Sequence, residues 1–201
     1  MLIQRSSLAS ASINSMVTAK WTSRSRLCFW IILTAWCQTA SVKVNSQPIV
    51  GVQRGTYLVL SREWKPRDTV QLRMEMQPRF VEAHHRLREN TSSYALMRGP
   101  LVYCLEGVDN PHVSRMDVRL NAAEVGAGGA LQARKASDLL GGVVALHVPG
   151  FTPDADTQAP LYQTARPRQP LLEHEVDLVF IPYYTRANRA PTWMKVWVPF
   201  K

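Results

Sequence analysis

The sequence predicts an all-β protein built from two small β-sandwich-like domains in tandem. Several runs alternate apolar and polar residues with a period of two, which is typical of strands with one buried face. The 13 prolines and 10 glycines in 201 residues fit many short strands joined by turns better than a helical bundle. A hydrophobic content of 46% with 19% charged residues is that of a globular chain, long enough to bury real cores.

The expected organisation has three segments. Residues 1–24 are rich in Ser, Thr and Ala and contain no acid, so we expect an unassigned, poorly ordered N-terminal segment. Residues 25–84 are expected to form a partial first β-sandwich domain, and residues 85–201 a C-terminal β-sandwich domain. The charged stretch 79–90 is expected to link the two.

The apolar run at residues 27–36, LCFWIILTAW, has two interpretations. It has about half of the roughly 20 residues that a membrane-spanning helix needs, so we expect no membrane partner. Arginines precede it as in a signal-peptide core, but its only cleavage pattern, at residues 35–37, is poor. We therefore predict a buried strand and no convincing signal peptide, with a signal core as the alternative. The localisation then stays unknown, cytoplasmic by default.

Further strands are expected in order along the first domain. The alternation predicts them at residues 41–45, 56–60 and 69–76, with turns at 45–46 and 63–68. In the last strand one apolar face carries Val70, Leu72, Met74 and Met76, and the opposite face is polar.

The second domain is expected to be organised around a strand at residues 101–106, LVYCLE. Both of its faces are apolar, which predicts a strand buried on both sides. Gly99-Pro100 sets its start, and the charges of Arg98 and Glu106 bracket it. Other strands are predicted at 94–97, 116–120, 143–148, 175–181 and 193–198, with a flexible glycine-rich stretch at 124–130 and a proline-rich loop at 151–170.

The net charge of +9 raises the question of an anionic partner. The excess lies in the N-terminal half and is spread out, without the interleaved stacking aromatics of single-strand binders. We therefore expect a solvated, arginine-rich surface and no specific nucleic-acid partner. The alternative, a basic nucleic-acid-binding protein, requires the charges of residues 54–88 to fall on one face.

Cysteines and histidines give no metal or nucleophile motif. Cys28, Cys37 and Cys104 are an odd number without a C-x-x-C pair, and each lies in or beside an apolar run. His84 and His85 are consecutive, so in an extended segment their side chains are expected to point apart. We therefore predict no catalytic, metal or cofactor-binding residue among them.

Three alternating acids, Glu173, Glu175 and Asp177, are expected on one face of a strand. Glycosidic hydrolysis uses two carboxylates, but these must flank the bond from opposite sides. We therefore predict a solvated edge rather than a catalytic pair.

Tyr183, Tyr184, Asn188 and Arg189 form the cluster best suited to recognition. Aromatic rings with amide and guanidinium donors fit either a sugar or another protein domain. Packing or inter-domain contact is favoured over sugar binding, and both stay open.

Five stretches carry a resemblance to a known family. They are AWCQTASVKVN (35–45), SREWKPRD (61–68), RGPLVYCLEGVDNP (98–111), DLLGGVV (138–144) and IPYYTRANR (181–189). In this order they resemble the β-rich C-terminal half of the non-reducing-end β-L-arabinofuranosidases of glycoside hydrolase family 127. The family's catalytic helical barrel, with its zinc and its nucleophilic cysteine, has no counterpart in this resemblance.

The resemblance implies an accessory β-domain fragment that is inactive alone and binds no cofactor. Its expected partner is a catalytic helical barrel domain or an oligomer partner, and in the intact family the hydrolysed glycans are plant-type arabinose glycans. A stand-alone carbohydrate-binding module is the second interpretation, favoured if exposed Trp or Tyr rings line a groove.

Three positions depart from the family pattern. The family usually has Asn-Gly at residues 45–46, where this chain has Asn45-Ser46, so a tight two-residue hairpin is disfavoured. The family has Gly at the position of Arg67 and usually Trp at the position of Arg186. The last change weakens an intact sugar platform around Tyr183 and Tyr184.

Overall fold

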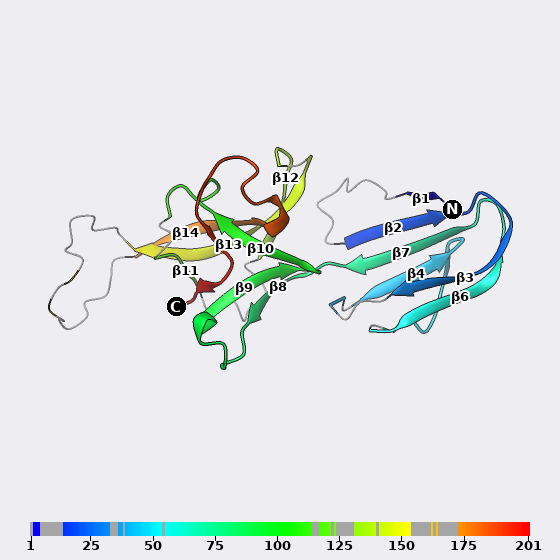
Figure 1. Cartoon of the computed structure of the whole chain (residues 1–201), viewed down its shortest axis with the longest axis horizontal. Coiled ribbons are helices and arrows are strands. Elements are labelled where there is room, and N and C mark those ends of the chain that lie inside the picture. Colours follow the sequence, from blue (N-terminus) through cyan, green and yellow to red (C-terminus); the bar gives the residue numbers. More distant parts are fainter. Residues whose placement is uncertain are drawn as a thin grey trace. The chain divides into compact units, whose positions relative to one another are not determined.

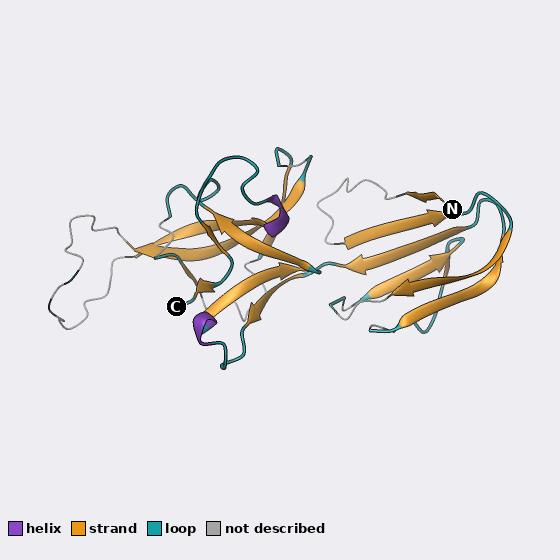
Figure 2. Cartoon of the chain, in the orientation of Figure 1, coloured by secondary structure: helices purple, strands orange, loops and turns teal. Residues whose placement is uncertain are grey.

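The computed structural model describes residues 2–4, 14–32, 36–37, 39–53, 55–113, 117–121, 123, 131–139, 141–153, 162, 164 and 173–201. The chain divides into two compact units. Unit 1 is Met1–Gln77 with Arg98–Pro100, and unit 2 is Pro78–Met97 with Leu101–Lys201. Figures 1 and 2 show strands throughout both units, with two short 3-10 turns in unit 2. The all-β prediction is confirmed.

Unit 1 is a sandwich of a five-stranded sheet, in the order β1-β2-β7-β4-β5, and a two-stranded sheet, β3-β6. Its strands are β1 (Leu2–Gln4), β2 (Asn14–Lys20), β3 (Ser25–Ile32), β4 (Ala40–Val44), β5 (Gln47–Pro48), β6 (Tyr57–Trp64) and β7 (Thr69–Glu75). Both sheets contribute to the core, which includes Val42, Ile31 and Trp64. The rings of Trp21 and Trp64 stack with centroids 4.0 Å apart and planes 9° from parallel.

The N-terminal segment differs from the sequence prediction, because it contributes a strand to unit 1. β2 pairs with β7 along its whole length, from Asn14 opposite Glu75 to Lys20 opposite Thr69. Its order comes from backbone hydrogen bonds to a neighbouring strand and from the burial of Ala19, which is 4% exposed. The composition of residues 1–24 predicts neither the pairing with β7 nor the burial of Ala19.

The tight hairpin that the sequence disfavoured is present. Val44 and Gln47 are paired across the β4–β5 turn, so Asn45 and Ser46 form a two-residue loop with φ of 50° and 68°. Positive φ at both central residues is the requirement of a type I′ turn. Asn45 is fixed by tertiary bonds: its amide donates to Asp68 at 2.7 Å, and its Oδ1 accepts from the Thr69 N–H at 2.8 Å. These bonds, made to residues far along the chain, offset the missing glycine.

Unit 2 holds a nine-stranded sheet whose main order is β11-β13-β14-β10-β9-β16, with β8, β12 and β15 paired at its sides. The strands are β8 (Pro78–Glu82), β9 (Ser93–Arg98), β10 (Leu101–Glu106), β11 (Arg119–Leu120), β12 (Gln132–Ala136), β13 (Val143–Pro153), β14 (Glu173–Pro182), β15 (Met194–Lys195) and β16 (Val198–Pro199). The two 3-10 turns are η1 (Arg88–Asn90) and η2 (Tyr183–Thr185).

The predicted central strand has the predicted bounds as β10, between β14 and β9 in the sheet. Tyr103 and Leu105 join the main core, and Cys104 joins a second apolar cluster on the opposite face. Val102 is 38% exposed, so burial on both faces holds only for the later part of the strand. Gly99, with φ of 57°, makes the short link from β9 that leads into it.

The link between the units differs from the expectation of a charged link at residues 79–90 and of a domain border after residue 84. β8 pairs with β9 inside unit 2, so the contacts divide the chain between Gln77 and Pro78. Of the predicted loop at 151–170, residues 151–153 belong to β13, while 154–161, 163 and 165–170 lie outside the described residues. The predicted glycine-rich stretch at 124–130 and residues 33–35 of the apolar run also lie outside them. No helix within the described ranges is long and apolar enough to cross a membrane.

Candidate functional site

The segment 183–189 follows β14 and begins with the 3-10 turn η2. Tyr183 and Tyr184 are 44% and 59% exposed, so both rings face solvent. Thr185 between them and the next loop is fully buried, and its hydroxyl donates to the Pro182 carbonyl at 2.6 Å. The segment therefore combines an exposed aromatic edge with a buried anchor.

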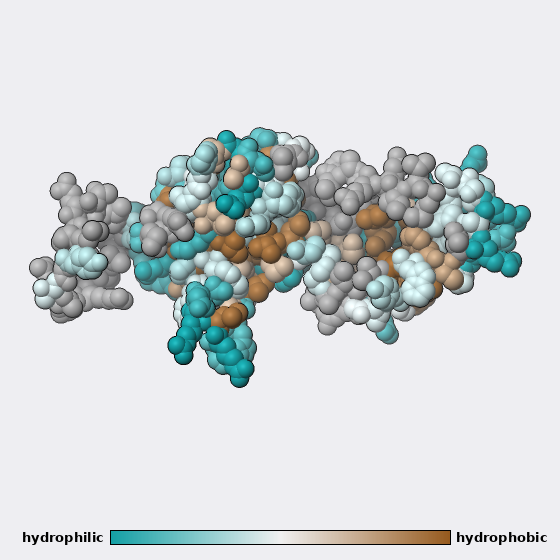
Figure 3. Space-filling model, viewed as in Figure 1, coloured by the Kyte–Doolittle hydropathy of each residue, from teal (hydrophilic) through white to brown (hydrophobic). Residues whose placement is uncertain are grey.

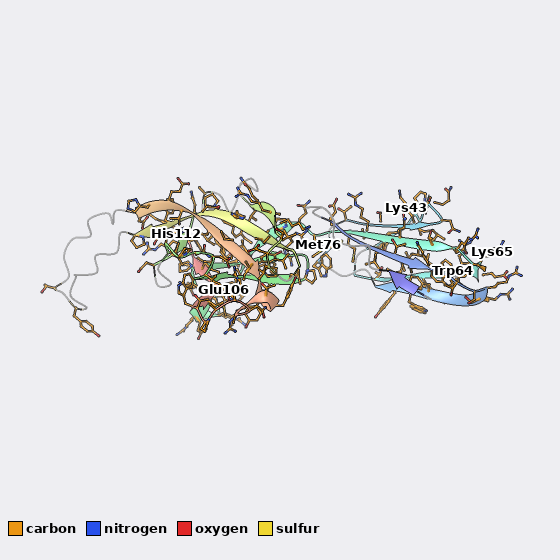
Figure 4. The ribbon with its side chains drawn as sticks, turned by 90° about the horizontal axis from the view of Figure 1, so that it is seen from above. Lys43, Trp64, Lys65, Met76, Glu106 and His112 are labelled. Atoms are coloured by element: carbon orange, nitrogen blue, oxygen red, sulfur yellow. The ribbon has the colours of Figure 1, made fainter. Side chains whose placement is uncertain are left out.

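Glu106, at the end of β10, is the second anchor of this segment. Its side chain lies inside unit 2 (Figure 4), and the residue is 1% exposed. Its Oε1 accepts the Ala187 N–H at 2.6 Å, and its Oε2 accepts from Arg189 Nη2 at 3.3 Å. A buried carboxylate needs such partners, because an unpaired buried charge is costly.

Arg189 joins Glu106 to Asp109, on the turn that follows β10. Its Nη1 donates to Asp109 Oδ1 at 2.7 Å, and its Nη2 also pairs with Asp109 Oδ2. The hydrogen bond to Asp109, with the charges of Asp109 and Glu106, raises the pKa of Arg189 above its ordinary value against the opposing effect of burial. The guanidinium is therefore permanently charged and held by two carboxylates, which leaves it little capacity for a ligand.

Asn110 is the last member of this polar cluster, and its side chain forms hydrogen bonds with the backbone of β14. It is fully buried, and its Oδ1 accepts the Val179 N–H while its Nδ2 donates to the Val179 carbonyl, each at 2.9 Å. Nδ2 also donates to the Glu106 carbonyl at 2.9 Å. The amide therefore supplies β14 with the two hydrogen bonds that a neighbouring strand would make.

The structure divides the cluster predicted from sequence into two parts. Asn188 donates to the Thr185 carbonyl at 2.8 Å, and Arg189 is paired with carboxylates, so both have structural contacts. Tyr183 and Tyr184 alone present free ring surface to solvent. From the sequence, Glu106 was identified only as a charge at the end of a strand, because its partner Arg189 lies 83 residues away.

Cys104 has the surroundings of an inert thiol. Burial among apolar side chains, with the nearby charge of Glu106, raises its pKa to about 12. Cys37 is also buried, while Cys28 is exposed. The three cysteines are unpaired with one another, and the described part of the chain contains no cluster of three or more His, Cys, Asp or Glu that could hold a metal.

The predicted acidic edge of β14 is only partly solvated. Glu173 accepts from Lys201 Nζ at 2.5 Å and lies 3.6 Å from Arg119 Nη1, with its side chain 8% exposed. Asp177 is 54% exposed at its side chain and pairs with His147 Nδ1 at 2.7 Å. Glu173 and Asp177 are therefore paired with these neighbours, while Glu175 is exposed.

The expectation that His84 and His85 point apart is wrong. Their ring centroids are 4.0 Å apart at 35°, because residues 84–87 form a turn closed by the Leu87 N–H bond to the His84 carbonyl at 2.8 Å. His84 Nδ1 accepts from the Arg86 N–H at 3.3 Å and is not free for a metal. Figure 3 shows the loop between β8 and β9 as a hydrophilic projection.

The sequence prediction missed an exposed aromatic pair in unit 1. In β3, Phe29 and Ile31 pack toward the core, while Trp30 is 62% exposed on the opposite face. Tyr57, on β6, is 63% exposed, and its ring lies 6.0 Å from that of Trp30 at 74°. The apolar run was interpreted as a buried strand. The signal against it was that neighbouring residues of a strand cannot all face one core.

The fold and the site together define an all-β chain of two units whose polar cluster holds loops in place. The family model described as "Glycoside hydrolase family 127 C-terminal domain" matches residues 78–199, and "Beta-L-arabinofuranosidase, GH127 middle domain" matches residues 2–76. The chain belongs to glycoside hydrolase family 127. The border between the two matches agrees with the division of the chain at Gln77.

Individual relatives agree with this assignment. A non-reducing end beta-L-arabinofuranosidase of Bifidobacterium longum subsp. longum is 34% identical over 170 residues, which are 84% of this chain and 25% of that protein. The crystal structure of a GH127 beta-L-arabinofuranosidase from Geobacillus stearothermophilus T6 matches 99% of this chain and 30% of its own at 30% identity, with a TM-score of 0.75. A GH127 beta-arabinofuranosidase structure at 21% identity, with a TM-score of 0.77 and coverage of 99% and 31%, shares the fold. The chain spans about a quarter of the curated relative's length.

Proposed function

We infer that the two units are the accessory β-part of a β-L-arabinofuranosidase of this family, and that they brace a catalytic barrel without holding a catalytic centre. The observation that carries this is the succession of the middle-domain and C-terminal-domain matches over residues 2–76 and 78–199. The barrel, or a further copy acting as an oligomer partner, is the proposed partner. The arabinose-containing glycans of plants are the proposed substrates of the intact enzyme.

The side-chain chemistry of unit 2 supports the inactive role of these units. A thiolate nucleophile needs a lowered pKa, whereas Cys104 has a pKa of about 12. Glu106 accepts hydrogen bonds from Ala187 and Arg189, so it is not placed to protonate a glycosidic oxygen. The described residues do not fit the zinc that the family uses, since no sufficient donor group is brought together among them.

The test is an assay of the purified chain against an aryl β-L-arabinofuranoside, with and without added zinc, together with a measurement of bound metal. We expect no turnover and no stoichiometric zinc. Cys104→Ser is the decisive variant, and Cys28→Ser, at an exposed thiol, is its matched control. Turnover by the native chain would refute the proposal, and its loss in Cys104→Ser with retention in Cys28→Ser would identify Cys104 as the nucleophile.

A carbohydrate-binding role is a second candidate, because one observation favours it. Trp30 and Tyr57 expose most of their ring surface next to each other. Exposed aromatic rings are suited to stacking against sugars, and such a role is compatible with the proposed lack of catalysis in these units.

A further inference from the structure

The outer face of the two-stranded sheet in unit 1 carries a group of five exposed, uncharged side chains. They are Cys28 and Trp30 from β3, with Tyr57, Val59 and Ser61 from β6, and we call them the Trp30 face. The register places Cys28 opposite Ser61 and Trp30 opposite Val59. Tyr57 precedes Val59 by two residues on the same side of β6. All five are exposed, so the described parts of the chain leave this face open.

Trp30 and Tyr57 form a corner of two aromatic rings on this face. They are 62% and 63% exposed, and their planes meet at 74° with centroids 6.0 Å apart. Such rings combine a flat apolar surface with a polar tip, and they are usually buried or engaged in binding. Next to them, Ser61 Oγ accepts from the Cys28 thiol at 3.5 Å, so the hydroxyl retains its own hydrogen for a ligand.

The size of the Trp30 face favours a small occupant over a protein. From Cys28 to Ile32 a strand advances about 14 Å, and two strands are about 10 Å wide, which gives roughly 140 Å². A stable protein interface buries about 800 Å² on each partner. The face alone is therefore too small for a second copy or another domain, and it fits a short oligomer of rings.

The charge of the Trp30 face favours a neutral occupant. Its five side chains include no Asp, Glu, Lys, Arg or His. At its end, Arg24 and Glu63 neutralise each other through a contact of 2.6 Å. Arg26, exposed and opposite Glu63, lies on the same side of β3 beyond Cys28. An anionic polymer would find no cation among the five side chains of the Trp30 face, whereas a sugar offers C–H groups to the rings and hydroxyls to Ser61 and Tyr57.

We propose that the Trp30 face binds a neutral oligosaccharide, with one sugar ring stacked on Trp30 and hydroxyls bonded to Tyr57 and Ser61. The choice of an arabinose-containing ligand rests on the proposed function, and the stacking site itself does not. The face would hold glycan chains near the enzyme that these units accompany.

The test is a titration of the full chain with neutral arabino-oligosaccharides, with binding measured by calorimetry. Affinity electrophoresis in gels that contain a neutral arabinose polysaccharide is the second measurement. Polygalacturonate is the anionic comparison. Trp30→Ala should weaken binding about tenfold, and Trp30→Phe should restore most of it because a ring is retained. Tyr162→Ala is the control, since Tyr162 is an exposed tyrosine of unit 2 outside the candidate recognition cluster and should leave binding unchanged.

Three results would overturn the proposal: no binding by the native chain, equal binding by Trp30→Ala, or loss of binding in Tyr162→Ala alone. Sedimentation of the same samples adds a fourth, a dimer that Trp30→Ala dissociates, because a second copy would then occupy the face. Far-UV circular dichroism of each variant verifies that the fold is intact. Turnover of an arabinofuranoside would refute the proposed function, while the binding measurement decides this proposal independently.

Discussion

Arg67 occupies a backbone conformation that only glycine adopts without cost. It follows Pro66 in a turn closed by the Asp68 N–H bond to the Lys65 carbonyl at 3.0 Å, and its φ is 75°. A turn with Pro at the second position and positive φ at the third is of type II, in which glycine is preferred at that third position. The left-handed conformation costs about 1–2 kcal/mol for a residue with a Cβ.

Arg67→Gly should therefore stabilise unit 1. Relief of about 1–2 kcal/mol is offset by about 0.4–1 kcal/mol, because glycine gives the unfolded chain more conformational freedom. The net gain of roughly 0.5–1 kcal/mol corresponds to a rise in Tm of about 2–8 °C for a domain of this size. Thermal and urea unfolding followed by far-UV circular dichroism measure it.

The matched control is Arg67→Ala, which removes the same exposed side chain and keeps the Cβ. Alanine should leave the melting temperature nearly unchanged, because the positive φ stays strained. An equal gain in both variants would mean that removal of the arginine charge causes the effect. No gain in Arg67→Gly would refute the strain argument.

Three further outcomes follow from the described contacts. Hydrogen bonds from the Lys65 N–H and the Asn45 amide hold the pKa of Asp68 below its ordinary value. The ionised carboxylate therefore stabilises the fold above about pH 4, and this stabilisation is lost as the pH falls through the folded-state pKa. Asp68→Asn should make the free energy of unfolding depend less on pH in the acidic range. Asn110→Ala should lower the free energy of unfolding of unit 2, measured in urea, by at least about 3 kcal/mol, because the N–H and carbonyl of Val179 lose their hydrogen bonds to the amide. A loss below about 1 kcal/mol would contradict the structural role of Asn110. At pH 8 a thiol reagent should label Cys28 but not Cys104 in the native chain, and early labelling of Cys104 would contradict its burial.

The sequence predicted the elements whose signal is local. β10 was predicted with its bounds because both faces are apolar and Gly99-Pro100 precedes it. β2 was not predicted, because its formation depends on pairing with β7, whose paired residues lie 49 (Lys20 to Thr69) to 61 (Asn14 to Glu75) positions further along the chain. β8 was interpreted as a linker because of its charged surroundings, although it pairs with β9.

The site was harder to predict than the fold, because its contacts are distant in sequence. Tyr183 and Tyr184 were identified as candidate contacts and are exposed, but Arg189 was considered without its carboxylate partners. Whether any of them contacts a sugar or another domain stays a prediction. The outward position of Trp30 was missed, because an apolar run gives no indication of which face is covered.

The structural role of the buried Glu106 cluster is decided most directly by the free energy of unfolding of Glu106→Ala, measured against Glu175→Ala at an exposed position of β14. Glu106→Ala leaves the Ala187 N–H without its acceptor and removes one carboxylate from Arg189. We predict a loss of about 3 kcal/mol for Glu106→Ala and less than about 0.5 kcal/mol for Glu175→Ala. Equal stabilities of the two variants would contradict the conclusion that this cluster holds the loop of Tyr183 and Tyr184 in place.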